Sequence, residues 1–328
     1  MKRLISYVLI LLLAASLCGC SGGAYETGGD GLSIVTTVFP AFDFAREIAG
    51  EQGNVCLLVP PGSESHSFEP TAQDIQRIGS CDLLICNGGE SEAWLEEILE
   101  GAEGDINVLS MLDCVTALEE ETKEGMQVAG HDHDHEHGED EGDEHEHHEH
   151  EEIEYDEHVW TSPVNAQLIC RAICEKLCEA DSANAPVYRK RLESYCGELR
   201  ELDREFRALT ENAPHKTVIF ADRFPVRYFT EEYGLDYYAA FPGCADDAEP
   251  SARTVAFLID KVREEQCPAV FYIEFSNQKM ADVICEDTRC GKLLFHSCHN
   301  VSRDELVSGV SYLTLMRSNV DSLREALG

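Results

Sequence analysis

Residues 186–210 read PVYRKRLESYCGELRELDREFRALT, and this stretch decides the fold. Its large apolar side chains alternate at spacings of four and three residues, at positions 188, 192, 195, 199, 202, 206 and 209. That spacing predicts a helix with one apolar stripe and charged remaining faces. At 1.5 Å per residue the helix is about 36 Å long. Because this length crosses a small protein, we expect the helix to join two halves of the chain.

Apolar, β-branched segments alternate with helical patterns on both sides of this helix. Strands are expected at 32–39, 54–59, 82–86, 106–109, 217–220, 235–241, 269–275 and 292–296. Helices are expected at 40–49, 71–78, 92–99, 226–233, 251–265 and 278–287, with a terminal helix over 302–327. Such alternation favours parallel βαβ units. We therefore predict an α/β fold of two lobes with mostly parallel sheets flanked by helices, over 32–180 and 213–328, joined by the long helix within 181–212.

The N-terminal residues indicate export. Two basic residues precede an apolar stretch through Leu17 that is too short for a comfortable transmembrane helix, so 1–19 is interpreted as a signal peptide. The sequence LCGC ending at Cys20 resembles a bacterial lipobox, which implies cleavage before Cys20 and a lipid on its thiol. Residues 20–31 are then a flexible tether. The alternative is an ordinary signal peptide that ends near a cysteine.

The charge argues against a nucleic-acid-binding protein, and the cysteine count argues against complete disulfide pairing. With 63 acidic against 25 basic residues, the chain is a poor partner for nucleic acid. Much of the acid lies in 119–157, which lacks apolar periodicity and is predicted to be a disordered loop. Removing Cys18 and Cys20 from the 15 cysteines leaves 13, which cannot all pair. The cysteines at 170, 174 and 178 share one helix face and are interpreted as small buried apolar residues.

The acidic loop is also rich in histidine. Its imidazoles, interleaved with Asp and Glu, suit zinc, copper, nickel or cobalt, and indicate a transition metal without choosing one. A solvated polar loop is the alternative. The predicted secondary metal ligands are His131, His133, His135, His137, His145, His147, His148 and His150.

Three histidines outside the loop, and one aspartate, fall where a parallel sheet places ligands. His66 follows the second expected strand, and His296 ends the last one. His158 precedes a helix start, and Asp222 follows the strand that ends at residue 220. Ligands collect beyond the carboxyl ends of strands in open α/β sheets, and zinc accepts three imidazoles and one carboxylate. The predicted Zn²⁺ ligands are His66, His158, Asp222 and His296.

Two motifs carry a family resemblance. Residues 60–70, PPGSESHSFEP, and residues 156–166, DEHVWTSPVNA, resemble the two imidazole loops of the zinc/manganese ABC-transporter solute-binding proteins. Residues 228–235 and 249–251 resemble further family segments, so the similarity covers nearly the whole mature chain. It implies two lobes bridged by a rigid helix, with the metal in the interlobe cleft.

The resemblance assigns ligands unevenly. His66 and His158 match directly. The family has His or Glu as third ligand, where Asp222 is the nearest donor here, although its neighbour Arg223 offers a structural ion pair instead. The family's fourth ligand is Asp, and His296 stands in its place. Two further residues enter here: His299 competes with His296, and Glu274 is a predicted partner for an imidazole N–H.

The predicted function is capture of Zn²⁺ and its delivery to the permease of an ABC importer, by a lipid-anchored monomer on the extracytoplasmic face of a bacterial cell membrane. The histidine-rich loop would collect zinc for the cleft. A manganese or nickel receptor of the same fold, and a surface adhesin or sequestration protein, are alternatives. An enzyme is not expected, because a zinc hydrolase needs a general base and the sequence has no HExxH, GxSxG or P-loop motif.

Overall fold

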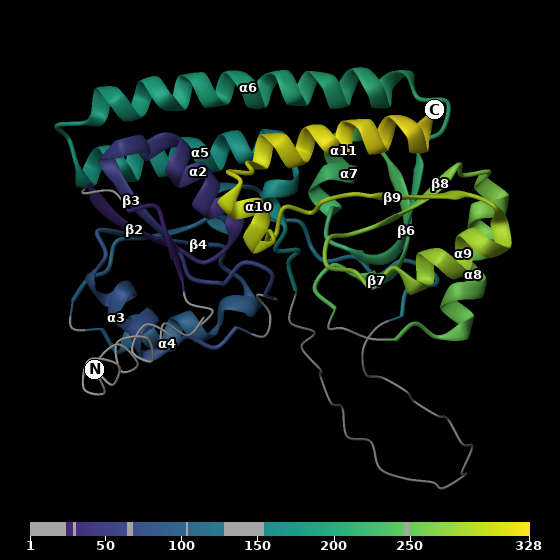
Figure 1. Cartoon of the computed structure of the whole chain (residues 1–328), viewed down its shortest axis with the longest axis horizontal. Coiled ribbons are helices and arrows are strands. Elements are labelled where there is room, and N and C mark those ends of the chain that lie inside the picture. Colours follow the sequence, from purple (N-terminus) through teal and green to yellow (C-terminus); the bar gives the residue numbers. More distant parts are fainter. Residues whose placement is uncertain (1–23, 29–30, 64–67, 103, 128–153, 246–248) are drawn as a thin grey trace, which may run out of the picture.

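The computed structural model describes residues 24–28, 31–63, 68–102, 104–127, 154–245 and 249–328. Two lobes lie side by side along α6 (Ala185–Asn212), which runs nearly the length of the molecule (Figure 1). The prediction of a long helix over 186–210 is therefore confirmed. None of the helices among the described residues has both the length and the hydropathy needed to cross a bilayer.

The N-terminal lobe is built on a five-stranded sheet with the order β1-β3-β2-β4-β5. Its strands are β1 (Tyr25–Glu26), β2 (Leu32–Thr36), β3 (Gly53–Leu57), β4 (Leu83–Cys86) and β5 (Val108–Ser110). Strands β2 to β5 are parallel, and β1 is antiparallel to β3. Because β1 lies within 20–31, the predicted flexible tether is wrong for these two residues.

Helices cover both faces of this sheet. They are α2 (Phe39–Ala49), α3 (Ala72–Ser80), α4 (Trp94–Glu100) and α5 (Pro163–Ala180), with 3₁₀ turns η1 (Gly50–Gln52), η2 (Glu90–Glu92), η3 (Leu112–Cys114) and η4 (Val159–Thr161). Successive residues of a strand point to opposite faces. Thus Ile34 of β2 packs in the cluster with α2, α5 and α6, and Val35 packs with Ile78 of α3 and Leu95 of α4.

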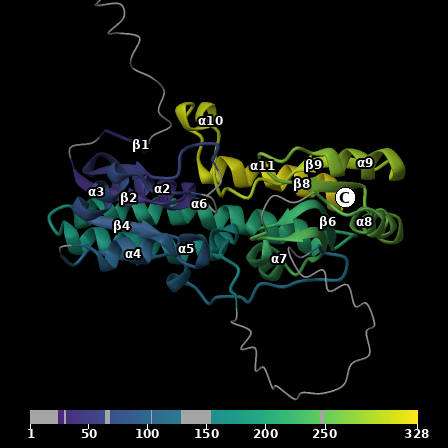
Figure 2. The same cartoon turned by 90° about the horizontal axis from the view of Figure 1, so that it is seen from below.

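The C-terminal lobe has a parallel four-stranded sheet with the order β7-β6-β8-β9. The strands are β6 (Thr217–Phe224), β7 (Asp236–Pro242), β8 (Ala269–Tyr272) and β9 (Gly291–Leu294), and the helices between them are α7 (Arg227–Tyr233), α8 (Ala252–Glu265) and α9 (Lys279–Thr288). Figure 2 shows the two lobes from a second direction, with α8 and α9 at the outer end of this lobe.

The end of the chain differs from the prediction of one terminal helix. Ser302 does cap a helix, but α10 (Arg303–Val307) stops after five residues and α11 (Tyr312–Leu327) begins anew. Gly309, with φ of 81°, takes a left-handed conformation that suits glycine, and the Ser311 side chain caps the second helix. Helix α11 then packs beside α6 (Figure 1).

The two ends of the predicted disordered loop 119–157 are ordered. Glu119 and Tyr155 form an isolated antiparallel bridge, and the Glu120 N–H donates to the Glu154 carbonyl at 2.9 Å. The Gln127 N–H donates to the Ala240 carbonyl of β7 at 2.8 Å. The chain thus crosses onto the C-terminal lobe before residues 128–153, which lie outside the described residues together with all eight loop histidines.

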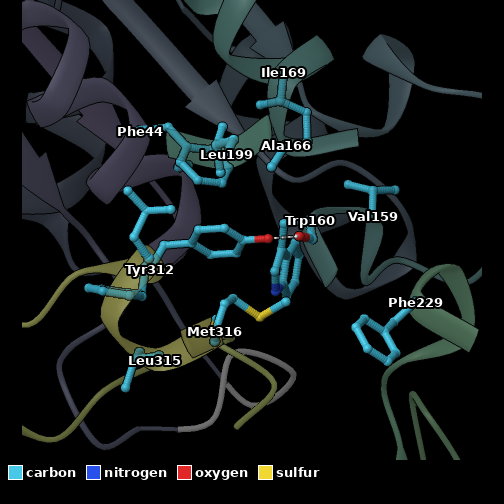
Figure 3. Close-up of a cluster of buried hydrophobic side chains, with 14 of the residues drawn as sticks. Phe44, Val159, Trp160, Ala166, Ile169, Leu199, Phe229, Tyr312, Leu315 and Met316 are labelled. Atoms are coloured by element: carbon cyan, nitrogen blue, oxygen red, sulfur yellow. Dashed lines mark hydrogen bonds between the residues drawn. The ribbon is translucent and has the colours of Figure 1, made fainter. Parts of the chain in front are cut away.

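One hydrophobic core runs through both lobes. Figure 3 shows Trp160 in a buried cluster with residues of α2, α5, α6, α7 and α11. Its indole Nε1 donates to the Ser297 carbonyl at 2.8 Å, and the Tyr312 hydroxyl donates to the Trp160 carbonyl at 2.8 Å. The first bond joins the segment that carries His158 to the segment that carries His299, and the second joins it to α11.

Candidate metal centre

His158 is fixed by the aspartate two residues before it. Asp156 Oδ1 accepts the His158 backbone N–H at 2.8 Å and lies 3.2 Å from the imidazole Nδ1. The His158 side chain is buried, so this contact favours the tautomer with the proton on Nδ1. Nε2 is then the nitrogen left to bind a metal, oriented by a carboxylate as in many metal sites.

His299 lies beside His158. The two ring centroids are 5.4 Å apart, with the ring planes at 85°, and the His299 ring lies 5.2 Å from Trp160. Both histidines line a pocket between the lobes. Its other lining residues are Ser63, Arg223, Pro225, Gly243, Ile273, Glu274, Phe275, Ser297 and Asn300.

Asn300 holds one wall of this pocket. Its side-chain amide donates to the carbonyl of Pro60 at 2.9 Å and to that of Ser63 at 2.7 Å. The loop after β3 is therefore fastened to the C-terminal lobe at Ser63, three residues before His66. His66 itself, and the lipidation candidate Cys20, lie outside the described residues.

His296 is held in a turn of its own. Its Nδ1 accepts the Cys298 N–H at 2.9 Å, and Asn319 of α11 bonds both its backbone N–H and its carbonyl at 2.8 Å. Glu274 Oε1 lies 3.6 Å from the same Nδ1, while Glu274 accepts bonds from the Ser297 N–H and hydroxyl. His296 is not among the residues that line the pocket, whereas His299 is.

Asp222 is likewise absent from the lining of the His158 pocket. Its Oδ1 accepts the Arg223 N–H at 2.9 Å, and Oδ2 accepts the Ile273 N–H at 3.4 Å. Burial raises the pKa of its carboxyl, against hydrogen bonds that lower it. Asp222 lines a second cavity, bordered by α8 and α9, and Arg223 lines both this cavity and the pocket of His158.

The three described members of the predicted ligand set, His158, Asp222 and His296, do not converge. Within the described ranges, no group of three or more His, Cys, Asp or Glu side chains is arranged to hold a metal ion. The four-ligand set therefore stays a prediction, and His299 is the imidazole that the structure places next to His158.

Comparison with known proteins identifies the family. The model of the zinc-uptake complex component A, periplasmic, matches residues 34–326. The chain belongs to this family. The high-affinity zinc uptake system protein ZnuA of Bacillus subtilis is 31% identical over 323 residues, which are 97% of this chain and 94% of that protein.

One relative is longer than this chain. The zinc-binding lipoprotein AdcA of Streptococcus pneumoniae R6 is 27% identical over 99% of this chain, which spans only 61% of AdcA. Among solved structures, the metal-dependent lipoprotein YcdH of B. subtilis superposes with a TM-score of 0.72 at 26% identity, over 90% of this chain and 100% of YcdH. The laminin-binding adhesin Lmb of Streptococcus agalactiae shares the fold, with a TM-score of 0.73 at 22% identity over 91% of this chain and 100% of Lmb.

Acidic neighbours set the protonation of His158. Burial alone would lower the pKa of the imidazole, but Asp156, Glu157 and Glu120 outweigh it, so the net pKa is raised from 6.5. A metal must displace protons from its imidazole ligands. We therefore expect the zinc affinity of the protein lacking 131–150 to begin to fall at a pH above 6.5, as the pH is lowered. Competition titrations at a series of pH values measure this.

The matched variant for this prediction is Asp156→Asn, which removes the nearest charge. It is expected to lower affinity at neutral pH by about tenfold, since it weakens the orientation of the ring. Its affinity should also begin to fall at a lower pH than that of the parent. Identical pH profiles for both proteins would contradict the role assigned to Asp156.

Proposed function

We propose that this protein captures Zn²⁺ outside the cytoplasm and delivers it to an ABC importer. The observation that carries the proposal is the pair His158 and His299, in an interlobe pocket of a member of the zinc-uptake family. Neutral imidazole is a strong zinc ligand. Relatives named for zinc uptake or zinc binding support zinc rather than manganese or nickel as the cargo.

We assign three imidazoles to the metal: His158, His299 and His66. Ser63 lines the pocket and lies three residues before His66 in the chain, which supports the third assignment. His296 and Asp222 are assigned supporting roles instead, because each is engaged by backbone N–H groups of its own turn or of a neighbouring strand.

Delivery requires no bond chemistry, only binding and release. The lobes share one continuous core, α6 spans both, and the segment before residue 128 is bonded to β7. Interfaces of this kind are not continuously deformable, so we expect a modest rearrangement on zinc binding. The proposal also includes a lipid anchor at Cys20, an extracytoplasmic location, a monomeric state and the permease as partner. Its domain limits are those expected from the sequence, except that Tyr25–Glu26 join the N-terminal sheet and both ends of the loop 119–157 are ordered.

The test is metal binding by the soluble mature protein lacking residues 131–150. One tightly bound zinc per chain, retained against an excess of manganese, is expected. No tight zinc in this protein would overturn the proposal, because the loop itself would then be the binding element and a sequestration or adhesion role would follow. If the protein binds zinc tightly but deletion of its gene does not impair growth at limiting zinc, the adhesin alternative would be favoured.

The loop has a separate expected effect. The Gln127 N–H donates to the Ala240 carbonyl, three residues before Gly243 of the pocket, and Glu154 lies four residues before His158, so both ends of the loop lead to segments that line the pocket. Deleting 131–150 is therefore expected to slow zinc uptake by cells severalfold at limiting zinc, through a lower local supply of metal. Uptake at saturating zinc should be unchanged. Equal uptake at limiting zinc would exclude the collecting role.

A further inference from the structure

The end of α9 brings two cysteines together. Arg289 follows the helix with φ of 69°, and its N–H donates to the Cys285 carbonyl at 2.9 Å. A left-handed residue at this position folds the chain back, so the residue three positions before the last helical residue meets the residue after the turn. Those two residues are Cys285 and Cys290, and their Sγ atoms are 3.5 Å apart. We propose that they form a reversible disulfide that ties α9 to β9.

The backbone holds both thiols in this position. The Gly291 N–H donates to the Pro268 carbonyl at 2.8 Å, which fixes the start of β9. The Cys290 N–H donates to the Thr288 hydroxyl at 3.3 Å, and the Cys285 thiol donates to the Gly291 carbonyl at 3.2 Å. Closing the S–S bond to its length of about 2.05 Å therefore requires side-chain rotation rather than refolding.

Most other described cysteines lack this combination of proximity and access. Cys170 and Cys298 are fully buried, and burial raises the pKa of each thiol well above its usual value. Cys174 and Cys178 interact on one face of α5, but i,i+4 positions on a helix hold Cβ atoms about 5–6 Å apart. A disulfide needs about 3.5–4.5 Å. Cys285 and Cys290 are both partly exposed.

The reaction is thiol–disulfide exchange with an external disulfide, R–S–S–R. The Cys290 thiolate attacks one external sulfur, forming a mixed disulfide and releasing R–S⁻. Cys285 then loses its proton and attacks the Cys290 sulfur, which releases the second R–S⁻. Two protein thiols are oxidised, one external disulfide is reduced to two thiols, and the two protons pass from the protein to those thiols.

The second step requires Cys285 to be ionised. Burial, together with the contact to the Cys290 thiol, raises the pKa of the Cys285 thiol to about 12, and Lys292 only partly opposes this. Little Cys285 is therefore ionised at neutral pH. The mixed disulfide on Cys290 is expected to accumulate briefly before the internal bond closes, and faster closure is expected as the pH rises.

The test incubates the mature chain in buffers of reduced and oxidised glutathione, then blocks free thiols and digests the protein with trypsin. Cleavage after Arg289 separates the two cysteines, so the disulfide leaves residues 280–289 joined to residues 290–292. The unaltered chain is expected to form the joined peptide. Cys81→Ser, a control in the other lobe, should form it in the same buffers. Cys285→Ser should instead keep a glutathione adduct on Cys290.

The oxidised protein is expected to unfold at a temperature a few degrees higher than the reduced protein, and Cys285→Ser should lose this difference. The proposal is overturned if both cysteines react with the thiol-blocking reagent in every buffer, or if glutathione adducts persist on the unaltered chain. Neither result depends on zinc, so the outcome is independent of the proposed transport function.

Discussion

Replacing His158 by alanine in the protein lacking residues 131–150 is expected to weaken zinc binding by more than about a hundredfold, since it removes a coordinating nitrogen rather than a residue behind it. His158 is buried and its Nδ1 is committed to Asp156, which leaves Nε2 as the nitrogen for a metal. Competition with a zinc-sensitive chelator measures the loss. His215→Ala, at a histidine before β6, is the matched control and should bind as the parent does.

The same titration separates the two candidates near the C-terminal end. His299→Ala is expected to weaken zinc binding as strongly as His158→Ala, because its ring lies beside that of His158. His296→Ala should keep most of the affinity while lowering stability, since its imidazole accepts the Cys298 N–H inside the fold. The reverse order of effects would restore His296 as the ligand, and Asp222→Asn tests the remaining prediction in the same way.

Local sequence signals predicted most of the fold. The apolar stripe placed α6 within two residues of its observed ends, and the helix expected at 226–233 ends at Tyr233 as α7, followed by Gly234 with φ of 62°. The family and the α/β architecture were predicted correctly as well. The predictions failed where contacts between residues distant in sequence determine the local structure. Tyr25–Glu26 becomes a strand only because β3 offers an edge, and residues 119–127 are ordered by β7.

The site was less predictable, for two geometric reasons. The register between β6 and β7 shifts between Phe220 and Arg223. A bulge changes which face each later residue occupies, and alternation in the sequence does not reveal it. Asp222 therefore lines the second cavity while Arg223 reaches the pocket. Near the other end, Cys298 with φ of 62° turns the chain, so that His299 rather than His296 meets His158.

Replacing Trp160 by alanine is expected to lower the free energy of unfolding by about 3–5 kcal/mol, the usual cost of truncating a large buried aromatic side chain. Trp160 is fully buried where residues of both lobes and of α6 meet (Figure 3). The variant also leaves the Ser297 carbonyl without its indole donor, which adds to the cost. Urea denaturation of the metal-free protein, followed by circular dichroism, measures the change.

Trp94→Ala provides the same chemical change outside this junction. Trp94 is only partly buried at the start of α4, against Phe68, and its loss should cost clearly less. Trp160→Ala should also weaken zinc binding, because the indole lies 5.2 Å from the His299 ring and holds the segment that carries it. Trp94→Ala should leave zinc affinity unchanged. The contrary result would be that both substitutions destabilise the protein equally and neither alters zinc affinity. In that case the continuous core does not position the metal ligands, and the two lobes bind zinc as separate bodies joined by α6.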